Sequence, residues 1–243
     1  MKKVYLNTII GLAEGLTQTE FTDYLLDQAI DIDGLEYRYE MFSKDTEQRK
    51  IEFLGFLETG KRKNWDLLLS IPDILFTAAG LTEKFEFYLK EARQLGAKRI
   101  KMNIGQLDGI SKVSVADFKE LLARYQIAVN IENDQTEENG RFEVVSEALK
   151  QIHQAGFPVS YTFDAGNYAV MKEDAIQAFA ALKNDTSIYH VKNVDTDLQT
   201  SLLNEGTIDW KAFLELDVPY VLEYPMPMSA IESELIIFKE AFY

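Results

Sequence analysis

The runs IAVNIE (127–132), VSYTFD (159–164), SIYH (187–190) and YVLE (220–223) each end on a residue that can bind a metal ion. All four runs are apolar and contain β-branched or aromatic residues, as β-strands do. The strands of a closed α/β barrel end at one common mouth, where such folds carry their active sites. The runs therefore predict an α/β fold with a site at its strand ends, formed by Glu132, Asp164, His190 and Glu223.

Strand-like runs alternate with helical patterns along the whole chain. Apolar residues recur at three- and four-residue spacing, as in one-sided helices, over 21–30, 82–97, 115–126, 141–156 and 174–184. The expected strands are 4–10, 34–41, 67–71, 99–104, 127–133, 159–164, 188–192 and 220–224. Their spacing of roughly 30 residues is the size of one strand–helix unit. We therefore predict a single-domain (β/α)8 TIM barrel over residues 1–243. An open doubly wound sheet remains the alternative, because periodicity does not show closure.

Local signals mark several ends of these elements. Thr17 and Glu20 have the spacing of a capping box at the start of a helix. Gly96 and Gly156 each follow a helical pattern and precede a strand, which is the expected place for a C-terminal glycine. The connections 11–16 and 41–50 are short, so we expect little material for a lid over the site.

Composition narrows the classes of partner. The formal net charge is −15, which disfavours nonspecific binding to nucleic acid or to anionic membranes. The chain has no cysteine, so disulfides, cysteine zinc sites and a thiol nucleophile are excluded. The segment MKKVYLNTII (1–10) lacks the apolar core of a signal peptide, and no apolar run approaches the length of a membrane span. We expect a cytoplasmic protein. Whether it forms a homo-oligomer stays open.

The residue types of the candidate site suit a divalent cation. Three carboxylates and one imidazole would repel each other unless a cation lay between them. Carboxylate oxygens with one ring nitrogen suit Mn²⁺, Mg²⁺, Co²⁺ or Zn²⁺, and the preponderance of oxygen favours one Mn²⁺ ion as the first choice. The only other histidine, His153, falls in a helical pattern and is expected on a helix surface.

Several stretches resemble the xylose isomerase-like superfamily of TIM barrels, in the branch of sugar phosphate isomerases and epimerases. They are DGLEYR (33–38), NIEN (130–133), TFDAGN (162–167), YHVKN (189–193), EGTIDW (205–210) and VLEYP (221–225). The resemblance implies a single metal held by the four strand-end residues named above. It also implies a small carbohydrate substrate and assigns Glu132 and Glu223 a second role as acid and base.

The chemistry that such a site performs is proton removal next to a carbonyl. The enediolate that results needs a cation to stabilise its oxygens and bases to remove and return the proton. Isomerisation and epimerisation of a small sugar, sugar phosphate or hydroxy-ketone both fit. A dehydratase or lyase acting on a keto-inositol-like substrate is the alternative, and a barrel that binds metal or carbohydrate without turnover is another. Endonuclease IV enzymes share the superfamily, but their trinuclear zinc site needs several histidines.

Four further residues are candidates for substrate contacts. Lys192 follows His190 by two residues and so points to the same side, where it would hold a substrate oxygen or pair with Asp195 or another acid. Asn167 stands where many relatives have a histidine. Glu36 and Arg38 share one face of a strand, where they would touch substrate or form a structural network below the metal.

The remaining polar and aromatic candidates have supporting roles. Gln106 and Asn133 end strands and are expected to support the metal ligands. Trp65, Trp210 and Phe76 are expected to pack in the core rather than to stack on a sugar.

Overall fold

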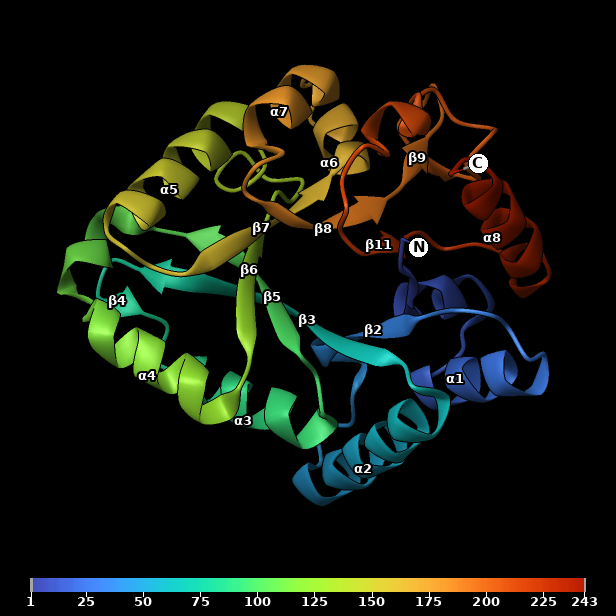
Figure 1. Cartoon of the computed structure of the whole chain (residues 1–243), viewed down its shortest axis with the longest axis horizontal. Coiled ribbons are helices and arrows are strands. Elements are labelled where there is room, and N and C mark those ends of the chain that lie inside the picture. The colour runs from blue at the N-terminus through green and yellow to red at the C-terminus, as the bar shows by residue number, and fades with distance from the viewer. Residues whose placement is uncertain (1, 243) are drawn as a thin grey trace.

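Eight parallel strands close into a barrel in the computed structural model, which describes residues 2–242 (Figure 1). Neighbouring strands pair in chain order, and the pairing of Tyr5 with Val221 joins the first strand to the last. The strands are β1 (Val4–Asn7), β2 (Gly34–Arg38), β3 (Asp66–Thr77), β5 (Arg99–Gly105), β6 (Ala128–Glu132), β7 (Val159–Asp164), β8 (Thr186–Val191) and β11 (Tyr220–Leu222). Closure confirms the predicted (β/α)8 TIM barrel and rules out the open sheet. The extent of the domain, 1–243, stays a prediction.

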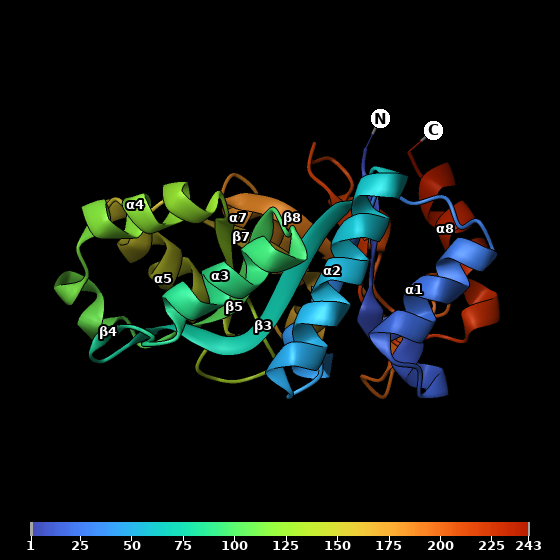
Figure 2. The same cartoon turned by 90° about the horizontal axis from the view of Figure 1, so that it is seen from below.

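Helices surround the barrel in both views (Figures 1 and 2). They are α1 (Gln18–Asp27), α2 (Thr46–Lys63), α3 (Phe85–Leu95), α4 (Val115–Tyr125), α5 (Phe142–Gln154), α6 (Ala165–Val170), α7 (Ala175–Leu182) and α8 (Ile231–Glu240). None of these helices combines the length and the apolar character that crossing a bilayer requires. The capping box of Thr17 and Glu20 is present, and Gly96 and Gly156 adopt positive φ after α3 and α5.

The longest helix, α2, is absent from the expected helical segments. Its first turn falls within 41–50, which we expected to be a connection. The helix is rich in charge and buries few residues, among them Phe53 and Phe56, so its apolar pattern is weak.

Some predicted strand ends are helical in the structure. The chain leaves β1 after Asn7 and enters a 3-10 helix (Thr8–Glu14), because the Asn7 side chain accepts a hydrogen bond from the Ile9 amide. The connection from β8 to β11 has no α-helix. It contains a small hairpin of β9 (Asn193–Val194) and β10 (Thr200–Ser201) and a 3-10 helix (Trp210–Phe213).

A thin apolar layer crosses the inside of the barrel. It consists of four buried residues from four strands: Tyr5, Leu68, Ile188 and Val221. Alternate residues on a strand point to the same face, so the next inward position on each of these strands lies one layer nearer the mouth. Those positions are all polar: Asn7, Ser70, His190 and Glu223. The apolar layer is thus the floor of a polar chamber.

The main core lies between the strands and the helices. Aromatic rings dominate it, and Phe163, Tyr189 and Phe213 stack behind β7 and β8. Trp65, Trp210 and Phe76 are buried in this core, which agrees with their expected packing role.

A buried ion pair between α2 and α3 gives a test of the fold. Arg49 Nε lies 2.6 Å from Glu91 Oε2, and both side chains are at most one-tenth exposed. Replacing Arg49 with Met leaves the Glu91 carboxylate buried without its cation. We expect Arg49→Met to lower the free energy of unfolding by about 3–5 kcal/mol, measured by urea denaturation.

The matched control is the next residue in the chain. Lys50 pairs with Glu47 at an exposed site, so Lys50→Met should leave the unfolding midpoint nearly unchanged. Equal losses of stability in the two variants would contradict the assignment of the Arg49 pair as the buried contact that joins these helices.

Candidate metal centre

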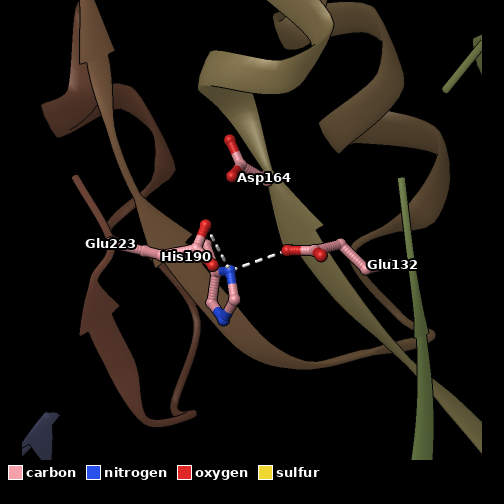
Figure 3. A group of neighbouring side chains, drawn as sticks. All are labelled: Glu132, Asp164, His190 and Glu223. Carbon is pink, nitrogen blue, oxygen red and sulfur yellow. Dashed lines mark ion pairs between the residues drawn. The ribbon is translucent and has the colours of Figure 1, made fainter. Parts of the chain in front are cut away.

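The four predicted metal ligands meet at one point in the barrel. One ligand atom from each of Glu132, Asp164, His190 and Glu223 lies within 4.8 Å of the other three, and all four residues are buried (Figure 3). They come from β6, β7, β8 and the position after β11, which are consecutive around the ring. The sequence prediction that these distant residues gather is therefore confirmed, while their binding of an ion stays a prediction.

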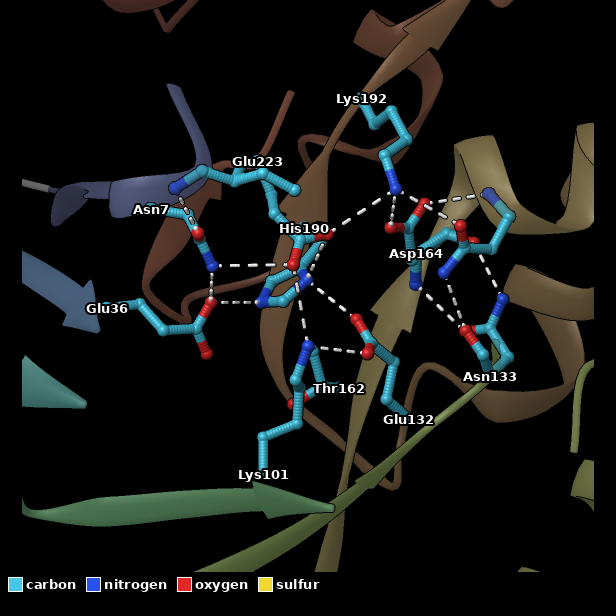
Figure 4. Close-up of polar contacts among 12 residues, drawn as sticks. Asn7, Glu36, Lys101, Glu132, Asn133, Thr162, Asp164, His190, Lys192 and Glu223 are labelled. Atoms are coloured by element: carbon cyan, nitrogen blue, oxygen red, sulfur yellow. Dashed lines mark hydrogen bonds and ion pairs between the residues drawn. The ribbon is translucent and has the colours of Figure 1, made fainter. Parts of the chain in front are cut away.

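His190 lies in the middle of the group. Its Nδ1 atom lies 2.7 Å from Glu132 Oε1 and 3.2 Å from Glu223 Oε2. On the other side of the ring, Nε2 lies 3.0 Å from Glu36 Oε2 (Figure 4). Carboxylates face both ring nitrogens, so a metal ligated by Nδ1 would leave the remaining proton on Nε2, where it faces Glu36.

The donor atoms fit a divalent cation. Glu132 Oε1 and His190 Nδ1 are both buried, and neither makes a well-directed hydrogen bond with residues 2–242. Buried polar atoms without a partner are rare and costly, so a ligand for them is expected. A cation between the three carboxylates and Nδ1 would satisfy both atoms.

Sequence reasoning missed Lys101, a buried residue of β5. Its Nζ atom lies 2.6 Å from Glu132 Oε2 and 3.5 Å from Glu223 Oε1. Glu132 therefore has one oxygen held by an ammonium group and one directed at the cluster. A signal was available, because Arg99, Lys101 and Asn103 alternate within an apolar strand and so face the barrel interior.

Lys192 points into the site, as its spacing from His190 predicted. Its Nζ atom lies 3.0 Å from Asp164 Oδ2, 3.4 Å from Glu223 Oε2 and 3.1 Å from Asn167 Oδ1. The alternative of an acidic partner is confirmed, but the partners are Asp164 and Glu223 rather than Asp195, whose carboxylate accepts hydrogen bonds from backbone amides of its own turn. Lys192 thus forms ion pairs with two of the four candidate metal ligands, Asp164 and Glu223.

Glu36 and Arg38 lie at different levels of the chamber. Glu36 is 1% exposed and accepts a hydrogen bond of 2.6 Å from Asn7 Nδ2 below His190, which supports the structural network suggested by the sequence. Arg38 lies nearer the mouth and pairs with Glu40 at 2.6 Å and with Glu223 at 3.2 Å. The two do not form an ion pair with each other.

Asn133 supports Asp164 as predicted. Its Nδ2 atom donates to the Asp164 carbonyl, and its Oδ1 atom accepts from the Asp164 amide. Asp164 Oδ1 in turn accepts from the Asn167 amide and so caps α6. Gln106 does not reach the site, because it is exposed and begins a 3-10 helix (Leu107–Lys112).

Burial and the buried cations set the protonation of the cluster. Burial by itself would raise the pKa of Glu223, but Lys101, His190 and Lys192 hold it well below its usual range. Burial raises the pKa of Asp164, and Lys192 offsets only part of that rise. Burial would lower the pKa of His190, yet Glu223, Glu36 and Glu132 raise it well above its usual value.

A cavity of about 300 Å³ opens beside the cluster and is lined by Arg38, Ser70, Lys101 and Glu132 among others. A larger cavity of about 470 Å³ lies at the other end of the barrel, around Asp66. We assign the chemistry to the smaller one, because Glu132 and Glu223 line it and it lies at the carboxyl ends of the strands.

The geometry makes metal binding testable. We expect wild-type protein to bind one Mn²⁺ per chain by isothermal titration calorimetry. Glu132→Gln and Asp164→Asn should each weaken binding at least tenfold, because each removes a charged ligand. Glu36→Gln should weaken it about 10–100-fold through the orientation of His190.

Glu143→Gln is the control, since Glu143 is an exposed carboxylate on α5. A wild-type stoichiometry that survives in Glu132→Gln and Asp164→Asn with unchanged affinity would place the ion elsewhere.

Proton competition gives a second prediction for the same site. Because the surrounding carboxylates raise the pKa of His190, a metal ligated by Nδ1 would have to displace a proton from that nitrogen. Affinity for Mn²⁺ should therefore rise with pH between 6 and 8, by up to about tenfold per pH unit. Calorimetry in two buffers of different ionisation enthalpy should show about one proton released. Binding that does not depend on pH would exclude His190 as a ligand.

Comparison with known proteins gives structural neighbours only. No family model and no curated protein matches the sequence. The probable 3-DHS dehydratase AsbF of Bacillus anthracis superposes with a TM-score of 0.72 at 15% identity, covering 98% of this chain and 99% of the neighbour.

Two further neighbours give similar values. D-allulose 3-epimerase from Methylomonas sp. has a TM-score of 0.69 at 12% identity, covering 99% of this chain and 98% of its own. The IOLI protein, solved with a bound zinc atom, has a TM-score of 0.68 at 17% identity, covering 99% and 96%. Together with the closed barrel, these neighbours show that the chain has a TIM-barrel fold over nearly its whole length.

Proposed function

We propose that this protein is a divalent-metal-dependent isomerase or epimerase of a small sugar, sugar phosphate or related hydroxy-ketone. The observation that carries the proposal is the buried group of Glu132, Asp164, His190 and Glu223 beside a cavity of about 300 Å³. The fold neighbours include sugar epimerases, which supports the same class of chemistry.

The metal would be held by these four residues. When bound, such an ion supplies positive charge that stabilises the oxygens of an enediolate. Mn²⁺ is our first choice because three of the four donors are carboxylates, with Mg²⁺, Co²⁺ and Zn²⁺ as alternatives. The neighbour solved with zinc supports metal binding without deciding which metal this chain uses.

Glu132 and Glu223 are the proposed acid and base. Their positions lie three strands apart in the ring. Glu132 Oε1 and Glu223 Oε2 both lie close to His190 Nδ1. Glu132 Oε1 makes no directed hydrogen bond within residues 2–242 and lies on the cluster side, and Glu132 lines the cavity where a substrate would bind. Lys101, His190 and Lys192 hold the pKa of Glu223 below its usual range, so its carboxylate is ionised before substrate binds.

Lys192 and Asn167 are proposed to position the substrate. Both line the cavity, and Lys192 can donate to a substrate oxygen at the cost of one of its present acceptors. Asn167 Nδ2 donates to the Asn133 carbonyl, and Asn167 Oδ1 accepts from Gln135 and Lys192, so the side chain is held in place at the cavity wall.

The reaction is tested by exchange of substrate protons with solvent. We expect purified protein with Mn²⁺ in deuterated water to incorporate deuterium next to the carbonyl of at least one ketose, sugar phosphate or hydroxy-ketone in a panel, followed by NMR. Glu132→Gln should lower the exchange rate at least 100-fold, because general-base catalysis contributes about 10²–10⁴-fold.

The outcome also decides between the alternatives. Exchange accompanied by net loss of water would identify a dehydratase or lyase. A protein that binds Mn²⁺ and exchanges no proton in the panel would contradict the proposal and favour a non-catalytic binding barrel. Glu143→Gln should match wild type throughout.

A further inference from the structure

A row of polar side chains crosses the barrel wall on strands that carry no metal ligand. Arg38 on β2 is paired in register with Ser70 on β3, and Ser70 is paired with Lys101 on β5. Residues paired across neighbouring strands point to the same face of the sheet. All three side chains line the cavity beside the metal ligands, so the row presents two cations and a hydroxyl to whatever occupies it.

The row has donors that the protein does not use. Arg38 Nε donates to Glu40 and Nη1 donates to Glu223, but Nη2 makes no hydrogen bond with any of residues 2–242. Ser70 is only 3% exposed, and its hydroxyl likewise has no hydrogen-bond partner within that range. Buried or half-buried donors of this kind are normally satisfied, which points to a ligand with acceptor oxygens.

The charges in the chamber agree with an anionic ligand. With the proposed divalent cation, Lys101 and Lys192 would offset the four buried carboxylates Glu36, Glu132, Asp164 and Glu223. Arg38 is then the remaining cation. Its carboxylate partner at the rim, Glu40, is 37% exposed and is therefore screened by water.

We propose that Arg38, Ser70 and Lys101 form a subsite for a terminal oxyanion of the substrate, a carboxylate or a phosphate. This inference rests on the proposed function and narrows it, since the substrate becomes a sugar acid or sugar phosphate instead of a neutral sugar. The planar guanidinium is suited to two oxygens of such a group, the Ser70 hydroxyl donates a further hydrogen bond, and Lys101 adds its charge.

The test compares three ligands that share a three-carbon frame: glycerol, D-glycerate and glycerol 3-phosphate. Binding to the purified protein is measured by calorimetry with and without Mn²⁺, because the metal also attracts anions. We expect at least one anion to bind at least tenfold more tightly than glycerol in both conditions. The tighter of the two identifies the source of the oxyanion. Anions that bind no better than glycerol, or not at all at 10 mM, would overturn the proposal.

Variants then assign the preference to the row. Ser70→Ala is the smallest change, and Arg38→Gln removes the unused donors. Each should lower anion affinity about five- to tenfold and leave glycerol binding unchanged. Lys101→Met should act in the same direction, and Lys101→Arg should restore the preference. Lys150→Met, on the exposed face of α5, is the charge-matched control.

An anion preference that persists unchanged in both Ser70→Ala and Arg38→Gln would sink the subsite, provided that both variants keep the wild-type melting temperature. Failure of the subsite and failure of the proposed function remain distinct. Deuterium exchange into neutral sugars alone, with no anion preference, would contradict the oxyanion subsite and support the proposed enzymatic function. Anion binding that depends on Arg38 and Ser70, without any deuterium exchange, would support the subsite and contradict the proposed enzymatic function.

Discussion

Mutual neutralisation of charges buried inside the barrel is the constraint on which the site depends. Four carboxylates and two lysines lie within a chamber from which most water is excluded. An isolated charge in such a place costs several kcal/mol, so each member is tolerable only while its partners stay in position. His190 links the group, because its two ring nitrogens lie within 3.2 Å of three of the carboxylates.

The same constraint explains the layering of the barrel. Inward side chains near the middle of four strands are apolar, and the next inward side chains on those strands are polar. The apolar floor packs the strands together, so their packing does not depend on the charged layer. The charged layer is then shaped by electrostatics and hydrogen bonds, with Asn7 and Asn133 tying its members to the backbone.

The strand ends carried enough information to predict the fold and the gathering of Glu132, Asp164, His190 and Glu223. Each of these residues ends an apolar run, and the strands of one barrel end at one mouth. Their proximity in space could therefore be predicted although they are distant in the chain. Lys101 was missed because it lies within its strand, two positions before Asn103, where no strand-end signal exists. The pairing of Lys192 depended on side-chain distances that spacing does not give. The helix α2 was not predicted, because charged residues interrupt its apolar stripe.

The candidate metal ligands and the proposed oxyanion subsite lie on different strands of the barrel. The candidate metal ligands come from β6 to β11, and the other polar row comes from β2, β3 and β5, so the two groups lie in different segments of the chain. Ion pairs of Arg38 with Glu223 and of Lys101 with Glu132 join the two segments. A substitution in the N-terminal row therefore also changes the charge that the candidate ligands experience, so the two segments are constrained to vary together.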